Sequence, residues 1–243
     1  MSLNKVMIKD KLKELEVEIE DITLGDFDSI GEYTAKKSRT PDKKEYKTVG
    51  CFFRPNYERG LLMYYLVGKK DIKTVLEIGF GRGYSTFCMA KAMCDFNIDG
   101  KIVTVDPNLD EKFLSYLTTI FPQSWFKKIE FVKATSEEYY SQNQNKNFDF
   151  IYIDGDHRYE AVKRDWEYSK DRFNKFVLFD DYHLPTKNQY DIECAKLIDQ
   201  IEGYKKELII MDRRIFFDDR RLSNEEIDYG QVLLGILWEK SFM

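Results

Sequence analysis

Four carboxylates and both histidines of the chain lie in two short strings. The string DGDH occupies residues 154–157 and DDYH occupies 180–183, each at the end of an apolar run. If these runs are neighbouring strands of a parallel sheet, their polar ends share one rim. Any one of these side chains could instead cap a helix or pack in the core, but six on one rim favour a site. Crowded carboxylates call for a divalent cation, and an all-oxygen set favours Mg²⁺, Mn²⁺ or Ca²⁺ over zinc.

A glycine-rich turn, EIGFGRG at 77–83, ends an earlier apolar run. It is not the dinucleotide fingerprint G-x-G-x-x-G, because Tyr84 stands where the last glycine would be. The next run ends at Asp106, 29 residues after Glu77, where a carboxylate could accept hydrogen bonds from ribose hydroxyls or simply cap a turn. Together the turn and Asp106 indicate an adenosine-containing cofactor without a pyrophosphate.

Short apolar runs alternate with helical patterns through the middle of the chain. The runs are nearly continuously apolar, as expected for strands covered on both faces of a parallel sheet. They lie at 73–79, 101–106, 128–134, 148–154 and 175–181, and the helical patterns lie near 84–94, 110–121, 135–142 and 159–172. Strand and helix in alternation predict an α/β fold with a doubly wound, Rossmann-like, mostly parallel sheet.

The two flanks of this core differ in pattern. An apolar stripe over residues 5–22 predicts an amphipathic helix, and 23–50, with a basic cluster at 36–47, reads as a loop or lid. Beyond a helix from residue 57 and another near 189–202, two apolar segments at 207–217 and 230–238 predict a C-terminal antiparallel hairpin. We therefore expect a seven-stranded sheet in a domain spanning 55–243, preceded by an N-terminal helical extension and basic loop at 1–54.

Composition limits the class of protein. Of the 243 residues, 43% are hydrophobic and 33% charged, which is typical of a folded globular chain. The absence of an apolar run of ~18 residues and the charged N-terminus argue against a membrane span or secretory signal, so a cytoplasmic location is expected. A net charge of −5 gives no general reason to bind nucleic acid. The four cysteines contain no C-x-x-C pair and are expected to be reduced packing residues.

The glycine turn and Asp106 resemble the first two motifs of the class I S-adenosylmethionine (SAM)-dependent methyltransferases, over roughly residues 55–238. The resemblance implies that Gly79 and Gly81 lie under the methionine part of SAM and that Asp106 holds its ribose. It further implies that Tyr84 and Ser85 contact the carboxylate end and that the stretch 134–136 lies near adenine. The implied cofactor-binding residues are Glu77, Gly79, Gly81, Gly83, Tyr84, Ser85, Asp106, Thr135, Ser136 and Asp154.

The strings at 154–157 and 180–183 resemble the metal-dependent O-methyltransferases, both the catechol and caffeoyl-CoA type and, more closely, the macrocin and novobiocin-type natural-product group. This resemblance implies that Asp154, Asp180 and Asp181 hold Mg²⁺ or another divalent cation. His157 falls where the catechol-type enzymes carry a basic lysine, so we expect it to be the general base. His183, Asp156 or a metal-bound hydroxide remain alternatives.

We therefore expect a SAM-dependent, divalent-metal-dependent O-methyltransferase acting on a hydroxyl of a small molecule or sugar. A dehydrogenase would need the glycine that Tyr84 replaces, and a DNA or RNA base methyltransferase would carry an (Asp/Asn)-Pro-Pro-(Tyr/Phe) string in place of IDGDH. Cephalosporin-hydroxylase-like chemistry on the same fold, or a non-catalytic binding or assembly protein, stays open. We expect no nucleic-acid or membrane partner, and a homodimer is compatible with the sequence.

Overall fold

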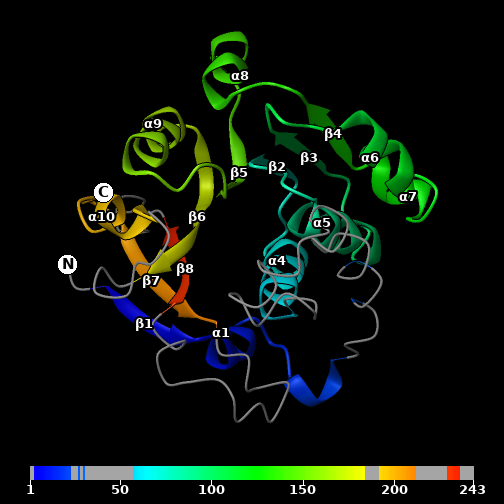
Figure 1. Cartoon of the computed structure of the whole chain (residues 1–243). Coiled ribbons are helices and arrows are strands. Elements are labelled where there is room, and N and C mark those ends of the chain that lie inside the picture. The colour runs from blue at the N-terminus through cyan, green and yellow to red at the C-terminus, as the bar shows by residue number, and fades with distance from the viewer. Residues whose placement is uncertain are drawn as a thin grey trace, which may run out of the picture.

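The structure, a computed structural model, describes residues 3–22, 27, 30, 57–183, 192–211 and 229–235, and these form one sheet between helices (Figure 1). The sheet has eight strands in the order β1-β7-β8-β6-β5-β2-β3-β4. The strands are β1 (Asn4–Met7), β2 (Thr74–Ile78), β3 (Lys101–Val105), β4 (Ile129–Val132), β5 (Phe148–Ile153), β6 (Phe173–His183), β7 (Lys205–Ile210) and β8 (Tyr229–Gly235).

All neighbouring strands are parallel except β8, which runs antiparallel to both β6 and β7. The chain adds β3 and β4 on one side of β2, and then adds β5 and β6 on the other. The strand order therefore reverses beside β2, and in open α/β sheets ligands bind at the carboxyl ends of the strands next to such a reversal. The predicted doubly wound, mostly parallel sheet with a C-terminal antiparallel pair is confirmed.

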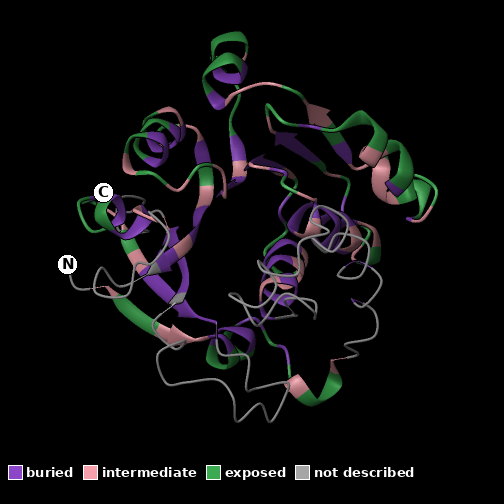
Figure 2. Ribbon diagram, in the orientation of Figure 1, coloured by how far each residue is buried: buried purple, intermediate pink, exposed green. Residues whose placement is uncertain are grey.

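Helices cover both faces of the sheet, and each face has its own core (Figures 1 and 2). Successive strand residues point to opposite faces, so in β2 Val75 packs in one core and Leu76 in the other. Helices α1, α4, α5 and α7 contribute to the first core, and α8, α9 and α10 to the second. The helices are α1 (Ile8–Glu14), α4 (Tyr57–Lys69), α5 (Tyr84–Asp95), α6 (Glu111–Leu117), α7 (Gln123–Phe126), α8 (Ser136–Gln142), α9 (Tyr159–Ser169) and α10 (Cys194–Ile198), with a 3₁₀ turn at Ile19–Asp21.

The N-terminal segment differs from the single helix predicted over residues 5–22. It begins with β1, which pairs in parallel with β7, and only then enters α1. The apolar stripe is nevertheless buried at Ile8, Leu12 and Leu15. The prediction of seven strands is wrong by one, because the backbone of β7 offers hydrogen bonds to β1 across about two hundred residues of chain, a pairing that no local periodicity records. The short helix α7 was also missed.

Several predictions fall on residues that the structure does not describe. The predicted loop at 23–50, with its basic cluster at 36–47, lies outside the described residues apart from 27 and 30, and Cys51 lies outside as well. The proposed boundary between residues 54 and 55 therefore stays a prediction. Within the described ranges, no helix is both long enough and apolar enough to cross a membrane.

Candidate active site

The glycine-rich turn after β2 is built from left-handed backbone. Gly79, Gly81 and Gly83 have φ angles of +99°, +55° and +84°, which explains why glycine stands at each position. A Cβ on Gly79 would lie 2.1 Å from the Asp154 carbonyl oxygen, so the turn touches the end of β5. A Cβ on Gly81 would meet no atom of the described residues within 4 Å. The turn thus packs against β5 on one side and leaves room above Gly81 for a ligand.

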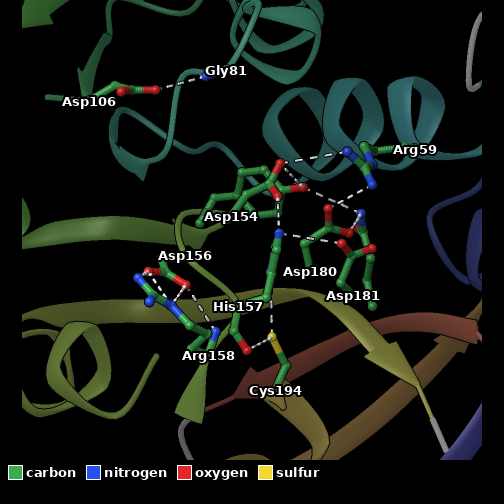
Figure 3. A network of polar contacts seen from close by, with 12 residues as sticks. Arg59, Gly81, Asp106, Asp154, Asp156, His157, Arg158, Asp180, Asp181 and Cys194 are labelled. Atoms are coloured by element: carbon green, nitrogen blue, oxygen red, sulfur yellow. Dashed lines mark hydrogen bonds and ion pairs between the residues drawn. The ribbon is translucent and has the colours of Figure 1, made fainter. Parts of the chain in front are cut away.

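Asp106, at the end of β3, braces this turn. Its Oδ2 accepts a hydrogen bond from the Gly81 amide at 3.0 Å, and its Oδ1 accepts one from the Asn108 amide at 2.7 Å (Figure 3). The residue is partly exposed. Because each carboxylate oxygen can accept a second hydrogen bond, Asp106 can still accept hydrogen bonds from ribose hydroxyls, which is the role predicted for it.

Glu77 lies beneath the turn and is 1% exposed. The hydroxyls of Thr86 in α5 and Thr104 in β3 both donate to its Oε2, the second at 2.7 Å. Burial raises the pKa of Glu77 to about 7. Its contacts therefore tie together the three elements that carry the turn, whereas its predicted contact with the cofactor stays a prediction.

The other predicted cofactor residues have structural partners of their own. Tyr84 packs against α4, where a Cβ on Gly60 would lie 2.5 Å from its hydroxyl oxygen, and Ser85 is buried. Thr135 caps α8 by accepting a hydrogen bond from the Glu138 amide at 3.2 Å. The Ser136 hydroxyl donates to the Asp165 carboxylate. Thr135 is thus the N-cap of α8, and contact of either residue with adenine stays a prediction.

The strings DGDH and DDYH meet at the carboxyl ends of β5 and β6, as predicted, and an arginine joins them (Figure 3). Arg59, in the first turn of α4, places Nη2 2.6 Å from Asp180 Oδ2 and Nη1 3.5 Å from Asp154 Oδ2. The Asp180 side chain is 1% exposed, against 20% for Asp154. A guanidinium therefore bridges the two carboxylates at the closed side of the site.

Burial and the charge of Asp180 hold the pKa of Asp154 well above its ordinary value. Burial alone would raise the pKa of Asp180, but the Arg59 guanidinium, the hydrogen bonds to Asp154 and Gln231 and the nearby His157 together hold that pKa below its ordinary value. Of this pair, Asp180 is thus the carboxylate that carries the negative charge.

His157 lies between the carboxylates and α10. Its Nε2 is 3.4 Å from Asp181 Oδ2 and 3.8 Å from Asp154 Oδ1, while its Nδ1 is 3.5 Å from the Cys194 sulfur (Figure 3). The ring is 27% exposed, so it is held on several sides but still reaches solvent. Asp181 has a φ of +53° and lies at an irregularity in the pairing of β6 with β8. Such an irregularity re-aims a side chain at the rim of a sheet.

Asp156 points away from this group and pairs with Arg158 (Figure 3). Hydrogen bonds from Arg158 lower the pKa of Asp156, which makes it a poor proton acceptor. His183 ends β6, and its side chain is outside the described part of the structure. Among the candidate bases whose side chains the structure describes, His157 is the one that the geometry places in the cluster.

The predicted metal set does not fit the geometry. Within the described residues, no group of three or more His, Cys, Asp or Glu side chains is arranged to hold a metal ion. Asp180 Oδ2 faces Arg59, and Asp180 Oδ1 accepts a hydrogen bond from Gln231 Nε2 at 2.9 Å. The Tyr152 hydroxyl donates to Asp154 Oδ2 at 3.1 Å. These oxygens are thus engaged by hydrogen-bond donors rather than directed at a common centre.

Four residues of this group were not identified from the sequence: Arg59, Tyr152, Cys194 and Gln231. Gln231 offered a signal, since it is the polar position of an apolar run that became β8. Arg59 offered none, because a single arginine in an amphipathic helix is ordinarily a solvent-facing residue.

Comparisons with known proteins agree with this geometry. Residues 76–182 match the model of a family described as a methyltransferase domain. The structure resembles an O-methyltransferase from Bacillus cereus in complex with SAH, with a TM-score of 0.54 and 15% identity, over 88% of this chain and 100% of that one. It also resembles the O-methyltransferase TomG from Streptomyces achromogenes, involved in tomaymycin synthesis and in complex with SAM, with a TM-score of 0.53 and 13% identity, over 89% and 99% of the two chains.

None of the curated proteins matches the sequence significantly. The matched segment, 76–182, begins in β2 and ends in β6, so it contains the glycine turn, Asp106, the string DGDH and all of DDYH except His183. Residues 76–182 therefore match a methyltransferase-domain family, and the chain has the fold of O-methyltransferases whose structures hold SAM or SAH.

Proposed function

We propose that this protein transfers a methyl group from SAM to a hydroxyl group of a small molecule or sugar. The observation that carries the proposal is the contact between the two halves of the site. The glycine turn packs directly on the Asp154 backbone, and His157 follows three residues later. A methyl donor bound over Gly81 would therefore lie beside an imidazole that can accept the proton of a hydroxyl.

The donor side of the site suits SAM rather than a dinucleotide. Asp106 offers carboxylate oxygens beside the turn, and the space above Gly81 is open. When bound, SAM supplies an electrophilic methyl group, whose bond to sulfur breaks as a bond to the acceptor oxygen forms. The residues of the turn and Asp106 would hold and orient it, because proximity and alignment account for much of the acceleration of such a displacement.

His157 would take the hydroxyl proton on Nε2. That nitrogen faces Asp181 and Asp154, so the positive charge that develops on the ring would meet carboxylate oxygens at 3.4 and 3.8 Å. The Cys194 sulfur beside Nδ1 would fix the orientation of the ring. A deprotonated hydroxyl is a far better nucleophile than a neutral one, which is why a base near neutral pH helps this reaction.

The test is formation of SAH. Purified protein is incubated with SAM and a panel of phenols, catechols and sugars, and SAH is quantified with and without each acceptor. Acceptor-dependent SAH release that is lost in His157→Ala and kept in Asp156→Asn supports the proposal. SAM binding without SAH release on any hydroxyl acceptor would favour the open alternatives, a binding protein or another chemistry on this fold.

A further inference from the structure

We propose that Arg59 is the built-in cation of this site, standing where the sequence alone suggested a divalent metal ion, and that the protein works without a bound metal. Only the effect of Arg59 on methyl transfer rests on the proposed function. Its structural part concerns how Asp154 and Asp180 are neutralised.

The position of the guanidinium is the first argument. Magnesium binds carboxylate oxygens at about 2.0 to 2.1 Å and calcium at about 2.3 to 2.6 Å. Arg59 Nη2 already lies 2.6 Å from Asp180 Oδ2, with Nη1 facing Asp154 Oδ2 at 3.5 Å. An ion bridging these two oxygens would overlap the guanidinium, so ion and arginine exclude each other.

Hydrogen-bond donors to the same two side chains point to the same conclusion. Gln231 Nε2 donates to Asp180 Oδ1 at 2.9 Å, and the Tyr152 hydroxyl donates to Asp154 Oδ2 at 3.1 Å. Metal coordination and N–H or O–H donation compete for the same lone pairs. Residues from β5, β8 and α4 thus supply hydrogen-bond donors to a pair that a metal site would leave open.

Burial explains why a cation is needed here at all. The Asp180 side chain is 1% exposed, and a buried carboxylate without a partner is strongly destabilising. Arginine keeps its charge at every pH that the folded protein meets, so the compensation does not depend on an ion that can dissociate. Arg59 then acts on His157 through Asp154, whose two oxygens face the guanidinium and the imidazole, as a positioning residue.

The experiment is a metal titration of the full chain. Protein dialysed against EDTA and then buffer is titrated with MgCl₂, MnCl₂ and CaCl₂ by calorimetry, and the melting temperature is measured with and without each salt. The wild type should give no saturable heat and no shift in melting temperature. Arg59→Gln should melt lower, gain saturable binding of at least one of these ions, and recover melting temperature when that ion is added.

A matched control removes the charge on both sides. In the double variant Arg59→Gln, Asp180→Asn, the carboxylate that Arg59 pairs with most closely is removed together with the arginine, so no gain of metal binding is expected. A general effect of salt on a weakened protein would instead appear in both variants. Arg59→Lys keeps one positive charge and provides a second, milder change if Arg59→Gln does not fold.

Two outcomes of these titrations would overturn the inference. Stoichiometric binding of Mg²⁺, Mn²⁺ or Ca²⁺ that disappears in Asp180→Asn would overturn the inference, as would an Arg59→Gln protein that folds but gains no metal binding. Once an acceptor is known, EDTA should leave the wild-type rate of methyl transfer unchanged. Added metal should raise the rate of Arg59→Gln and should not change the rate of the wild type. If the titrations give the expected results but no hydroxyl acceptor is methylated, the proposed function is refuted and the assignment of Arg59 is kept.

Discussion

Replacing Glu77 by glutamine should change how stability depends on pH. Glu77 is fully enclosed beneath the glycine turn, and burial raises its pKa from an ordinary value of 4.5 to about 7. The folded state therefore prefers the protonated carboxyl. The stabilisation that this preference gives is fully present below the unfolded-state pKa, near pH 4.5, and is lost as the pH rises through about 7.

The size of the effect follows from the shift. At about 1.4 kcal/mol per pKa unit, the change from 4.5 to about 7 corresponds to roughly 3 kcal/mol of unfolding free energy lost from acid to mildly alkaline pH. Glutamine does not titrate, and its amide oxygen can still accept the hydroxyls of Thr86 and Thr104. The stability of Glu77→Gln relative to wild type should therefore rise by roughly 3 kcal/mol between about pH 4.5 and pH 8.

Urea unfolding of the two proteins at a series of pH values measures this difference directly. Other titrating groups, such as Asp165, whose pKa burial raises to about 6, are present in both proteins and largely cancel. Glu202→Gln, at an exposed position, is the control for the loss of one carboxylate. If Glu77→Gln gives a flat difference from wild type across this range, then Glu77 is charged in the folded protein and the reasoning from its burial is wrong.

The remaining predictions concern the site itself. Asp106→Ala should weaken SAH binding by about 1 to 3 kcal/mol in calorimetry, because charge-assisted hydrogen bonds are lost, and an unchanged affinity would remove Asp106 from the ribose site. His157→Ala should lower kcat by about 10² to 10⁴ and abolish the acid limb of the pH–rate profile while SAH affinity is kept, and a retained acid limb would assign the base elsewhere. Gly79→Ala, at a φ of +99° and with its Cβ against the Asp154 carbonyl, should cost more than about 2 kcal/mol in denaturant unfolding. Gly203→Ala has a φ of +83° but meets no atom within 4 Å, so an equal cost in both variants would show that backbone conformation alone matters.

The central strands could be predicted because their physical cause is local. Strands covered on both faces are mostly apolar, so β2, β3, β5 and β6 appear in the sequence as nearly continuous apolar runs within a few residues of their observed bounds. The edge strand β1 has no such run. It forms because β7 presents unpaired backbone groups, and that pairing joins residues 4–7 to residues 207–210. Long-range pairing of this kind leaves no local pattern to read.

The site divides in the same way. The topology of a parallel sheet places strand ends on one rim, so the meeting of Asp154, His157 and Asp180 could be expected from the sequence. The partners of these residues could not. Cys194 reaches His157 because α10 packs against α9 and β6, and Arg59 reaches Asp180 because α4 packs beside α5. Those contacts depend on how helices lie on the sheet, which side-chain spacing does not determine.

The metal prediction illustrates what a cluster of carboxylates does and does not imply. Two aspartates at adjoining strand ends, one of them 1% exposed, require positive charge nearby, because an unpaired buried carboxylate is costly. The strings DGDH and DDYH therefore correctly indicate a need for a cation, but they carry no information on its source. A metal ion and an arginine can both supply that charge. A metal site requires oxygen lone pairs left open within the cluster, whereas an arginine requires one residue elsewhere in the chain. In this protein that residue is Arg59, more than ninety residues upstream of either string, and the donors from Tyr152 and Gln231 occupy the lone pairs that an ion would use.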